Sequence, residues 1–169
     1  LDGAAGAARG LELLAVGFEF GGAKWHAQHH GQRLAVAHFA PHAHHAVQIV
    51  ISMDGRVAIC GQDDAWQEGS GVVVQPDVVH SFDAQGAWAA MLFVDPESAE
   101  GLWLRSALTQ DITLVPEARL ESAVTALRTF TERPFEGMEI GALIRHCVRA
   151  LSPGAPPARR MDPRVSTVL

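Results

Sequence analysis

Short runs of apolar and β-branched residues repeat through the first part of the chain, and turn residues such as Gly, Pro and Asp separate them. Runs of this kind at regular spacing are typical of an all-β sandwich or a small barrel. We therefore expect a mainly β domain over residues 1–98. Its expected strands are 11–20, 33–39, 47–52, 57–60, 71–75, 80–83 and 88–94.

One turn carries a stronger local signal than the others. Asp54-Gly55 lies between two β-rich runs, 47–52 and 57–60. An Asp-Gly pair in that position is typical of a tight two-residue turn that joins two antiparallel strands. The sequence therefore predicts a β-hairpin here.

The hydrophobic period changes after Asp95-Pro96. Apolar residues then recur every three or four positions over 117–131 and 139–151, which predicts two amphipathic helices. Their apolar faces either cap the β-domain or pair with a second subunit. For the second alternative, the expected dimer interface is Leu120, Val124, Leu127, Ile140, Leu143, Ile144, Cys147 and Leu151.

The last part of the chain is expected to connect the helices to something further. Residues 152–160 are rich in Pro, which ends a helix and favours a linker. Asp162 and Pro163 suit the cap and the first position of a new helix. We thus expect a helical segment over 99–151, a linker over 152–160 and the start of another domain over 161–169.

Composition narrows the function classes. The chain has 169 residues, 48% of them hydrophobic, and a net charge of −6. Phosphate contacts need clustered Lys and Arg, so an acidic chain is a poor nucleic-acid binder. Two cysteines are too few for a disulfide scaffold and fit buried free thiols in the cytoplasm. No apolar run is long enough to span a membrane.

The charge and the histidines are distributed unevenly. Residues 1–100 carry 4 Lys+Arg and 12 Asp+Glu (net −8), whereas 101–169 carry 9 and 7 (net +2). Eight of the nine histidines lie in the first 80 residues. His26, His29 and His30 are expected in a loop, and His146 is expected at the surface or in an interface. The acidic half therefore holds the candidate chemistry.

The sharpest cluster surrounds one expected strand. His42 and His44 lie two residues apart, so in an extended chain their rings point to the same face, as does Gln48. His80 follows the next pair of strands and would complete the site from a neighbouring strand. Imidazoles that converge in this way suit a divalent transition metal such as Zn, Ni or Fe. The alternative is a polar lining of a pocket, to which Trp25 and Trp88 could contribute as ligand-binding side chains.

The spacing of these residues resembles the cupin family. The first cupin motif is His-x-His, three or four residues, Glu, six residues and Gly. This chain has His42-x-His44, three residues, Gln48, six residues and Gly55. The resemblance implies a cupin-like (RmlC-like jelly-roll) barrel with metal ligands at His42, His44, Gln48 and His80.

The second cupin motif fits in spacing but departs in chemistry. It is Gly, five residues, Pro-x-Gly, two residues, His, three residues and Asn, and here it starts at Gly69 and includes His80. Glu is replaced in the first motif, and three positions are replaced in the second. The replacements are Gln48, Gln75, Asp77 and Ala84. Loss of the anionic ligand weakens the metal expectation more than the fold expectation.

The order of the segments resembles transcription regulators of the AraC/XylS type. Four stretches carry the likeness, namely 44–55, 75–80, 92–98 and 162–169. The resemblance implies a sensor barrel that binds a small-molecule effector, helices that pair two subunits into a homodimer, and a helix-turn-helix domain that would begin at 161–169. DNA would be bound only through that further domain.

Two other functions compete with the sensor domain. A small metal-dependent cupin enzyme, such as a dioxygenase or isomerase, is disfavoured because Gln48 is neutral and no general base is paired with a nucleophile. A stand-alone binding module is disfavoured by the Pro-rich linker and the helix start that follows it. We therefore expect a non-enzymatic sensor.

Overall fold

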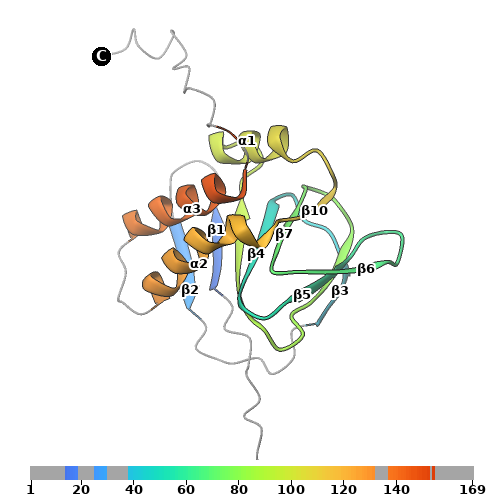
Figure 1. Cartoon of the computed structure of the whole chain (residues 1–169). Coiled ribbons are helices and arrows are strands. Elements are labelled where there is room, and N and C mark those ends of the chain that lie inside the picture. Colours follow the sequence, from blue (N-terminus) through green and yellow to red (C-terminus); the bar gives the residue numbers. More distant parts are fainter. Residues whose placement is uncertain (1–13, 19–24, 30–37, 132–136, 153, 155–169) are drawn as a thin grey trace, which may run out of the picture.

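The computed structural model describes residues 14–18, 25–29, 38–131, 137–152 and 154. They form strands packed in two sheets, with helices over one of the sheets (Figure 1). The strands are β1 (Leu14–Phe18), β2 (Trp25–His29), β3 (His38–His42), β4 (Val47–Asp54), β5 (Val57–Cys60), β6 (Trp66–Gly69), β7 (Gly71–Val74), β8 (His80–Asp83), β9 (Trp88–Val94) and β10 (Ile112–Leu114). The helices are α1 (Ala99–Ala107), α2 (Glu117–Thr131) and α3 (Gly137–Leu151).

The two sheets form a sandwich of the jelly-roll kind. The larger sheet has the order β10-β7-β4-β9-β1-β2 and the smaller has the order β3-β8-β5-β6. Their strand pairs are antiparallel except β1 with β9, which is parallel. The expected mainly β, cupin-like fold followed by C-terminal helices is confirmed.

Strand β4 is buried on both faces, and its alternating side chains serve two different cores. The odd-numbered residues from Val47 to Met53 join a cluster with the helices. Val50 belongs to a second cluster that lies between the two sheets. Gln48 and Ser52 share the face of Val50, because alternate residues of a strand point the same way. A polar side chain at Gln48 is therefore turned into the interior of the sandwich.

The predicted hairpin at Asp54-Gly55 is wrong. Strand β4 pairs with β7 and β9, whereas β5 pairs with β6 and β8. Both edges of β4 are therefore occupied, and the turn carries the chain from one sheet to the other. Gly55 adopts φ +88, a conformation that favours glycine, and an Asp54 carboxylate oxygen accepts a hydrogen bond from the Trp88 N–H at 2.6 Å.

The expected helix at 117–131 is confirmed residue for residue as α2, and the second begins at Gly137 rather than at 139. Four described elements were not among the expected strands and helices: α1, β2, β6 and β10. Helix α1 is capped by Ser98, whose hydroxyl accepts from the Gly101 N–H. The segment with His26 and His29 is strand β2 rather than a loop. His30 lies outside the described residues.

The helices cap the β-domain, which is the first of the two alternatives that their pattern left open. The apolar stripe packs on the larger sheet of the same chain, with Leu127, Cys147 and Leu151 fully buried. Because one chain already covers these side chains, they are core and not a free surface for a second subunit. The other buried members are Leu120, Leu143 and Ile144, with Val124 partly buried. Ile140 lies in α3, and its side chain is outside the described part.

The remaining expectations fall at the ends. The expected linker 152–160 is described only at Ser152 and Gly154, and the expected helix start 161–169 lies wholly outside the described residues. Cys60 and Cys147 are buried free thiols, as predicted. Among the described helices, none combines the length and the apolarity that a membrane span needs.

Candidate ligand site of the barrel

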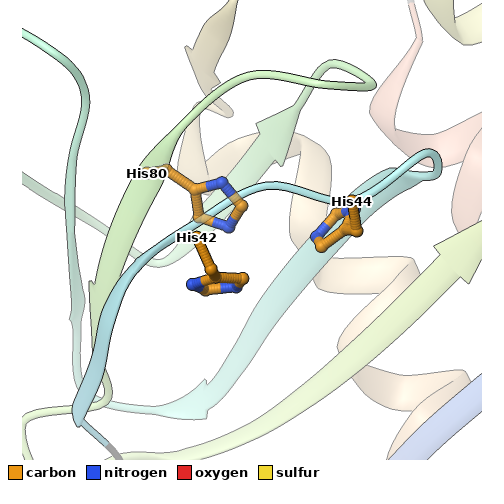
Figure 2. Close-up of side chains that lie close together, drawn as sticks. All are labelled: His42, His44 and His80. Carbon is orange, nitrogen blue, oxygen red and sulfur yellow. The ribbon is translucent and has the colours of Figure 1, made fainter.

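Three histidines and one glutamine meet at one end of the sandwich. His42 ends β3, His44 lies in the connection to β4, and His80 begins β8. Figure 2 shows the three rings gathered in one place, and one possible ligand atom from each lies within 4.8 Å of the others. The pairing of β3 with β8 sets His42 opposite His80, and their ring centroids are 4.4 Å apart. The sequence prediction of this cluster is thus matched in space.

Each imidazole is held by a main-chain carbonyl two residues away. The acceptors are Ala40 for His42 (2.8 Å), Ala46 for His44 (3.1 Å) and Val78 for His80 (2.9 Å), in each case to Nδ1. A carbonyl only accepts, so Nδ1 carries the proton in each ring. The Nε2 atoms are then left with lone pairs, the form in which a histidine binds a metal or accepts from a ligand.

Gln48 brings a fourth polar group to the same point. Its Oε1 lies 2.6 Å from Nε2 of His44 and 3.3 Å from Nε2 of His80, while its own Nε2 has no partner. The side chain is 1% exposed, so bulk solvent does not reach it. Exchanging the amide O and N would pair the NH₂ with the rings but would leave the oxygen without a donor. Nε2 of His44 and the amide oxygen are both acceptors in this assignment, so their 2.6 Å contact needs either the exchanged amide, whose NH₂ donates to the rings, or a cation between the two atoms.

His80 is kept in the neutral form that such binding needs. Its side chain is 1% exposed, and this burial lowers its pKa from the ordinary value of 6.5. The positive forms of His42 and His44 lower the pKa further, while the Val78 carbonyl opposes the shift. The buried imidazole is thus unprotonated at neutral pH.

The surroundings of the cluster are apolar on the inside and polar on the outside. The ring of Phe93 stands edge-on to His44 with the centroids 5.1 Å apart. On the outer side, His45 and Asp77 form an exposed pair at 2.9 Å. His45 is thus exposed to solvent. Sequence spacing gave no sign of Phe93, because the register of β4 and β9 is what brings it to the site.

A polar cavity of about 700 Å³ lies against the same turn. Asp77 and Val78 line it together with Asp63 and Asp111. The Val78 carbonyl also accepts from His80, so one turn separates the cavity from the histidines. The positive φ of Asp77 (+62) and a hydrogen bond from its N–H to the His44 carbonyl at 2.9 Å shape this turn. The cavity was not expected from the sequence.

Trp88 does not belong to the site. It pairs with Asp54, whereas Gln48 pairs with Phe93 at the other end of β9. Six residues of β4 therefore separate the two positions, about 20 Å along a strand. Trp88 also packs against the cluster on the helix side of the sheet. The amphipathic ring was a reasonable pocket residue, but the strand register places it elsewhere.

Trp25 also lies away from the cluster in the sheet order. It begins β2, and the strands β9 and β1 separate β2 from the β4 strand that carries Gln48. The side chain of Trp25 is outside the described part, so its role as a ligand contact stays a prediction. Trp66, another tryptophan of the β-domain, is 48% exposed in β6.

Comparison with known proteins identifies the family of the chain. The family model described as "AraC-like ligand binding domain" matches residues 27–162. A search of curated proteins found no match. The matched description is that of a ligand-binding domain rather than an enzyme. Because the match covers most of the 169 residues, the chain belongs to the family of AraC-like ligand binding domains.

Proposed function

We propose that the chain is the effector-sensing domain of an AraC-type transcription regulator. A small molecule binds inside the barrel at His42, His44, Gln48 and His80, and its binding controls an attached helix-turn-helix domain. The observation that carries the proposal is a cluster of three converging imidazoles and one buried amide whose NH₂ group has no partner, inside an otherwise apolar sandwich. Family membership supports the effector role.

Strand β4 is a direct route from the ligand to the helices. Gln48 faces the site, while its neighbour Ile49 belongs to the cluster that contains α2 and α3. At the far end of β4, Arg128 of α2 donates a hydrogen bond to the Met53 carbonyl. A ligand that moves Gln48 therefore also moves strand β4, against which the helices pack. Control follows only if the ligand prefers one of two helix arrangements.

Subunit pairing and DNA binding belong to the same proposal. Since the apolar stripe is core, a homodimer contact falls on the outward face of the helices, where Ala142, Arg145 and Arg149 are exposed. The chain carries a net charge of −6, so DNA contact is assigned to the further domain and not to these residues.

The four acceptors also fit a divalent cation. Three imidazole Nε2 atoms and one amide oxygen would hold Zn, Ni or Fe, all of which accept imidazole ligands. The Gln48 Nε2 without a partner supports a bound group that completes the network. A metal-dependent enzyme is the competing function, but among the described residues no Asp or Glu joins this cluster to act as an anionic ligand.

A thermal-shift panel tests the effector site. Monosaccharides, aromatic carboxylates and small hydroxy acids are added, each with and without Zn²⁺, to the wild-type chain, to His44→Ala and to His146→Ala. A ligand at 100 times its Kd adds about 2.7 kcal/mol of stability. We expect one class to stabilise the wild type and His146→Ala, whose histidine is exposed on α3, but not His44→Ala. Equal stabilisation of His44→Ala, or none of the wild type, contradicts the proposal.

Control of an attached domain needs a separate readout. The chain is joined to a DNA-binding domain whose operator needs two copies, and a reporter gene follows operator occupancy. The ligand found in the panel is expected to change the reporter signal in the wild type and to leave it unchanged in His44→Ala. A ligand that binds without any change in the signal would reduce the chain to a binding module.

A further inference from the structure

We infer that the ligand of this site is an anion that binds together with a divalent cation, because Gln48 leaves the donor set without negative charge. The inference rests on the proposed function and names the chemical class of its ligand.

The donor set is neutral in every member. The three imidazoles present unprotonated Nε2 atoms because each Nδ1 donates to a main-chain carbonyl. The fourth donor is an amide oxygen, which carries a partial but no full charge. A divalent cation held by this set would thus keep its entire charge of +2.

Among the residues that the structure describes, no carboxylate joins the cluster to offset that charge. Within the described part of the chain, the group that could hold a metal consists of His42, His44 and His80 without any carboxylate. The closest acidic residue along the turn is Asp77, whose carboxylate pairs with His45 in solvent. On the inner side the neighbours are apolar, with Phe93 against His44.

An uncompensated charge in such surroundings is costly. Gln48 and His80 are each 1% exposed, so the cation would lie partly out of water. A buried ion is stable when a counter-charge and hydrogen bonds complete it. An anionic ligand supplies that counter-charge, whereas a neutral sugar or amide does not. Four protein donors around a divalent ion also leave room for a further oxygen ligand when its coordination expands.

The exposure of the three histidines and the charge of the chain favour binding of the cation and the anion together. His42 and His44 are half-buried, while His80 is deep, so the open side of the site faces solvent past the first two rings. The chain has a net charge of −6, which disfavours the approach of an anion to the metal-free site. Binding of cation and anion is therefore coupled, and each raises the affinity for the other by the same factor.

The test uses Co²⁺ as the metal, because its visible absorption reports coordination directly. Co²⁺ is titrated into the wild-type chain alone, with acetate, and with acetamide. Acetate and acetamide have nearly the same shape and differ in charge. We expect acetate to tighten Co²⁺ binding roughly tenfold or more, which equals about 1.4 kcal/mol, and acetamide to leave it unchanged. Acetate without Co²⁺ is expected not to bind.

Gln48→Glu is the matched variant, since it restores one negative charge at the same place. It is expected to bind Co²⁺ more tightly by itself and to lose most of the acetate effect. Circular dichroism checks its fold, and if it fails to fold, the comparison of acetate with acetamide on the wild type decides the inference alone.

Two results would overturn the inference. One is an equal effect of acetate and acetamide on the wild type, and the other is an acetate effect of the same size in folded Gln48→Glu. Absence of Co²⁺ binding also overturns it, while the thermal-shift panel can still find a metal-free effector. Failure of the panel with a positive Co²⁺ result would instead place the metal site outside effector sensing.

Discussion

At the scale of single residues, the candidate site depends on where protons lie as much as on which side chains are present. The spacing of His42, His44 and Gln48 predicted their meeting because strand alternation needs only the sequence. The carbonyls that orient the rings were not predictable, because they depend on the turn geometry on either side of each histidine. The orphaned amide nitrogen of Gln48 was equally hidden from the sequence.

Cys147 gives a prediction about alkaline pH at this same scale. Burial raises the pKa of its thiol from 9.0 to about 12. Above pH 9 the unfolded chain loses this proton while the folded chain keeps it, so stability falls as pH rises through that window. The expected slope approaches about 1.4 kcal/mol per pH unit. Lys24 is the only lysine in the sequence and there is no tyrosine, so few other groups titrate in this window.

Urea unfolding at several alkaline pH values measures this slope. Cys147→Ala is expected to be less stable at neutral pH but to show a flatter decline above pH 9. Part of the decline remains, because the pKa of Cys60 is also raised by burial and by Asp64 and Asp63. An unchanged slope in Cys147→Ala would show that this thiol is not protected in the folded state.

At the scale of elements, the bounds of a helix could be predicted from the periodicity of its apolar residues, whereas the surface or strand that an element packs against could not. Helix α2 was found at its observed bounds because a repeat of three and four residues is written in the sequence. The surface against which the apolar stripe of α2 and α3 packs could not be predicted. An apolar stripe that packs in a core has the same sequence pattern as one that packs in a dimer interface. Strand β4 shows the same limit, because a turn signal at Asp54-Gly55 does not say which sheet receives the next strand.

The burial of the helix stripe leads to a matched pair of variants on α3. Ile144 is 1% exposed, whereas its neighbour Arg145 is exposed. Ile144→Ala is expected to lower the free energy of unfolding by about 2–5 kcal/mol, because it leaves a cavity in the core. Arg145→Ala is expected to change it by about 0.5 kcal/mol or less.

Urea unfolding and light scattering separate core from interface for this pair. If the apolar stripe of α3 belongs to the core, Ile144→Ala is less stable than the wild type but has the same oligomeric state. A stable Ile144→Ala that turns from dimer to monomer would return the stripe to a subunit interface.

At the scale of the whole molecule, the sandwich places one polar site and one helical layer on opposite faces of the same sheet (Figure 1). The fold class followed from the spacing of short strands and from two motifs of cupin spacing. The elements α1, β2, β6 and β10, whose sequences carry little periodicity, were not predicted. The cavity beside Asp77 and Val78 arises from three separate segments, so no local pattern announces it.

The nitrogen–proton NMR spectrum of the histidine side chains reports on the ligand site in the barrel without a substitution. It is recorded with and without the ligand found in the panel, and with and without Zn²⁺, which replaces Co²⁺ because it is diamagnetic. We expect His42, His44 and His80 to carry their protons on Nδ1, and we expect the added ligand to shift their Nε2 signals. His146 on α3 is expected to stay unchanged. Protons on Nε2 of all three rings, with no shift by any molecule that stabilises the chain, would contradict a ligand site in this barrel.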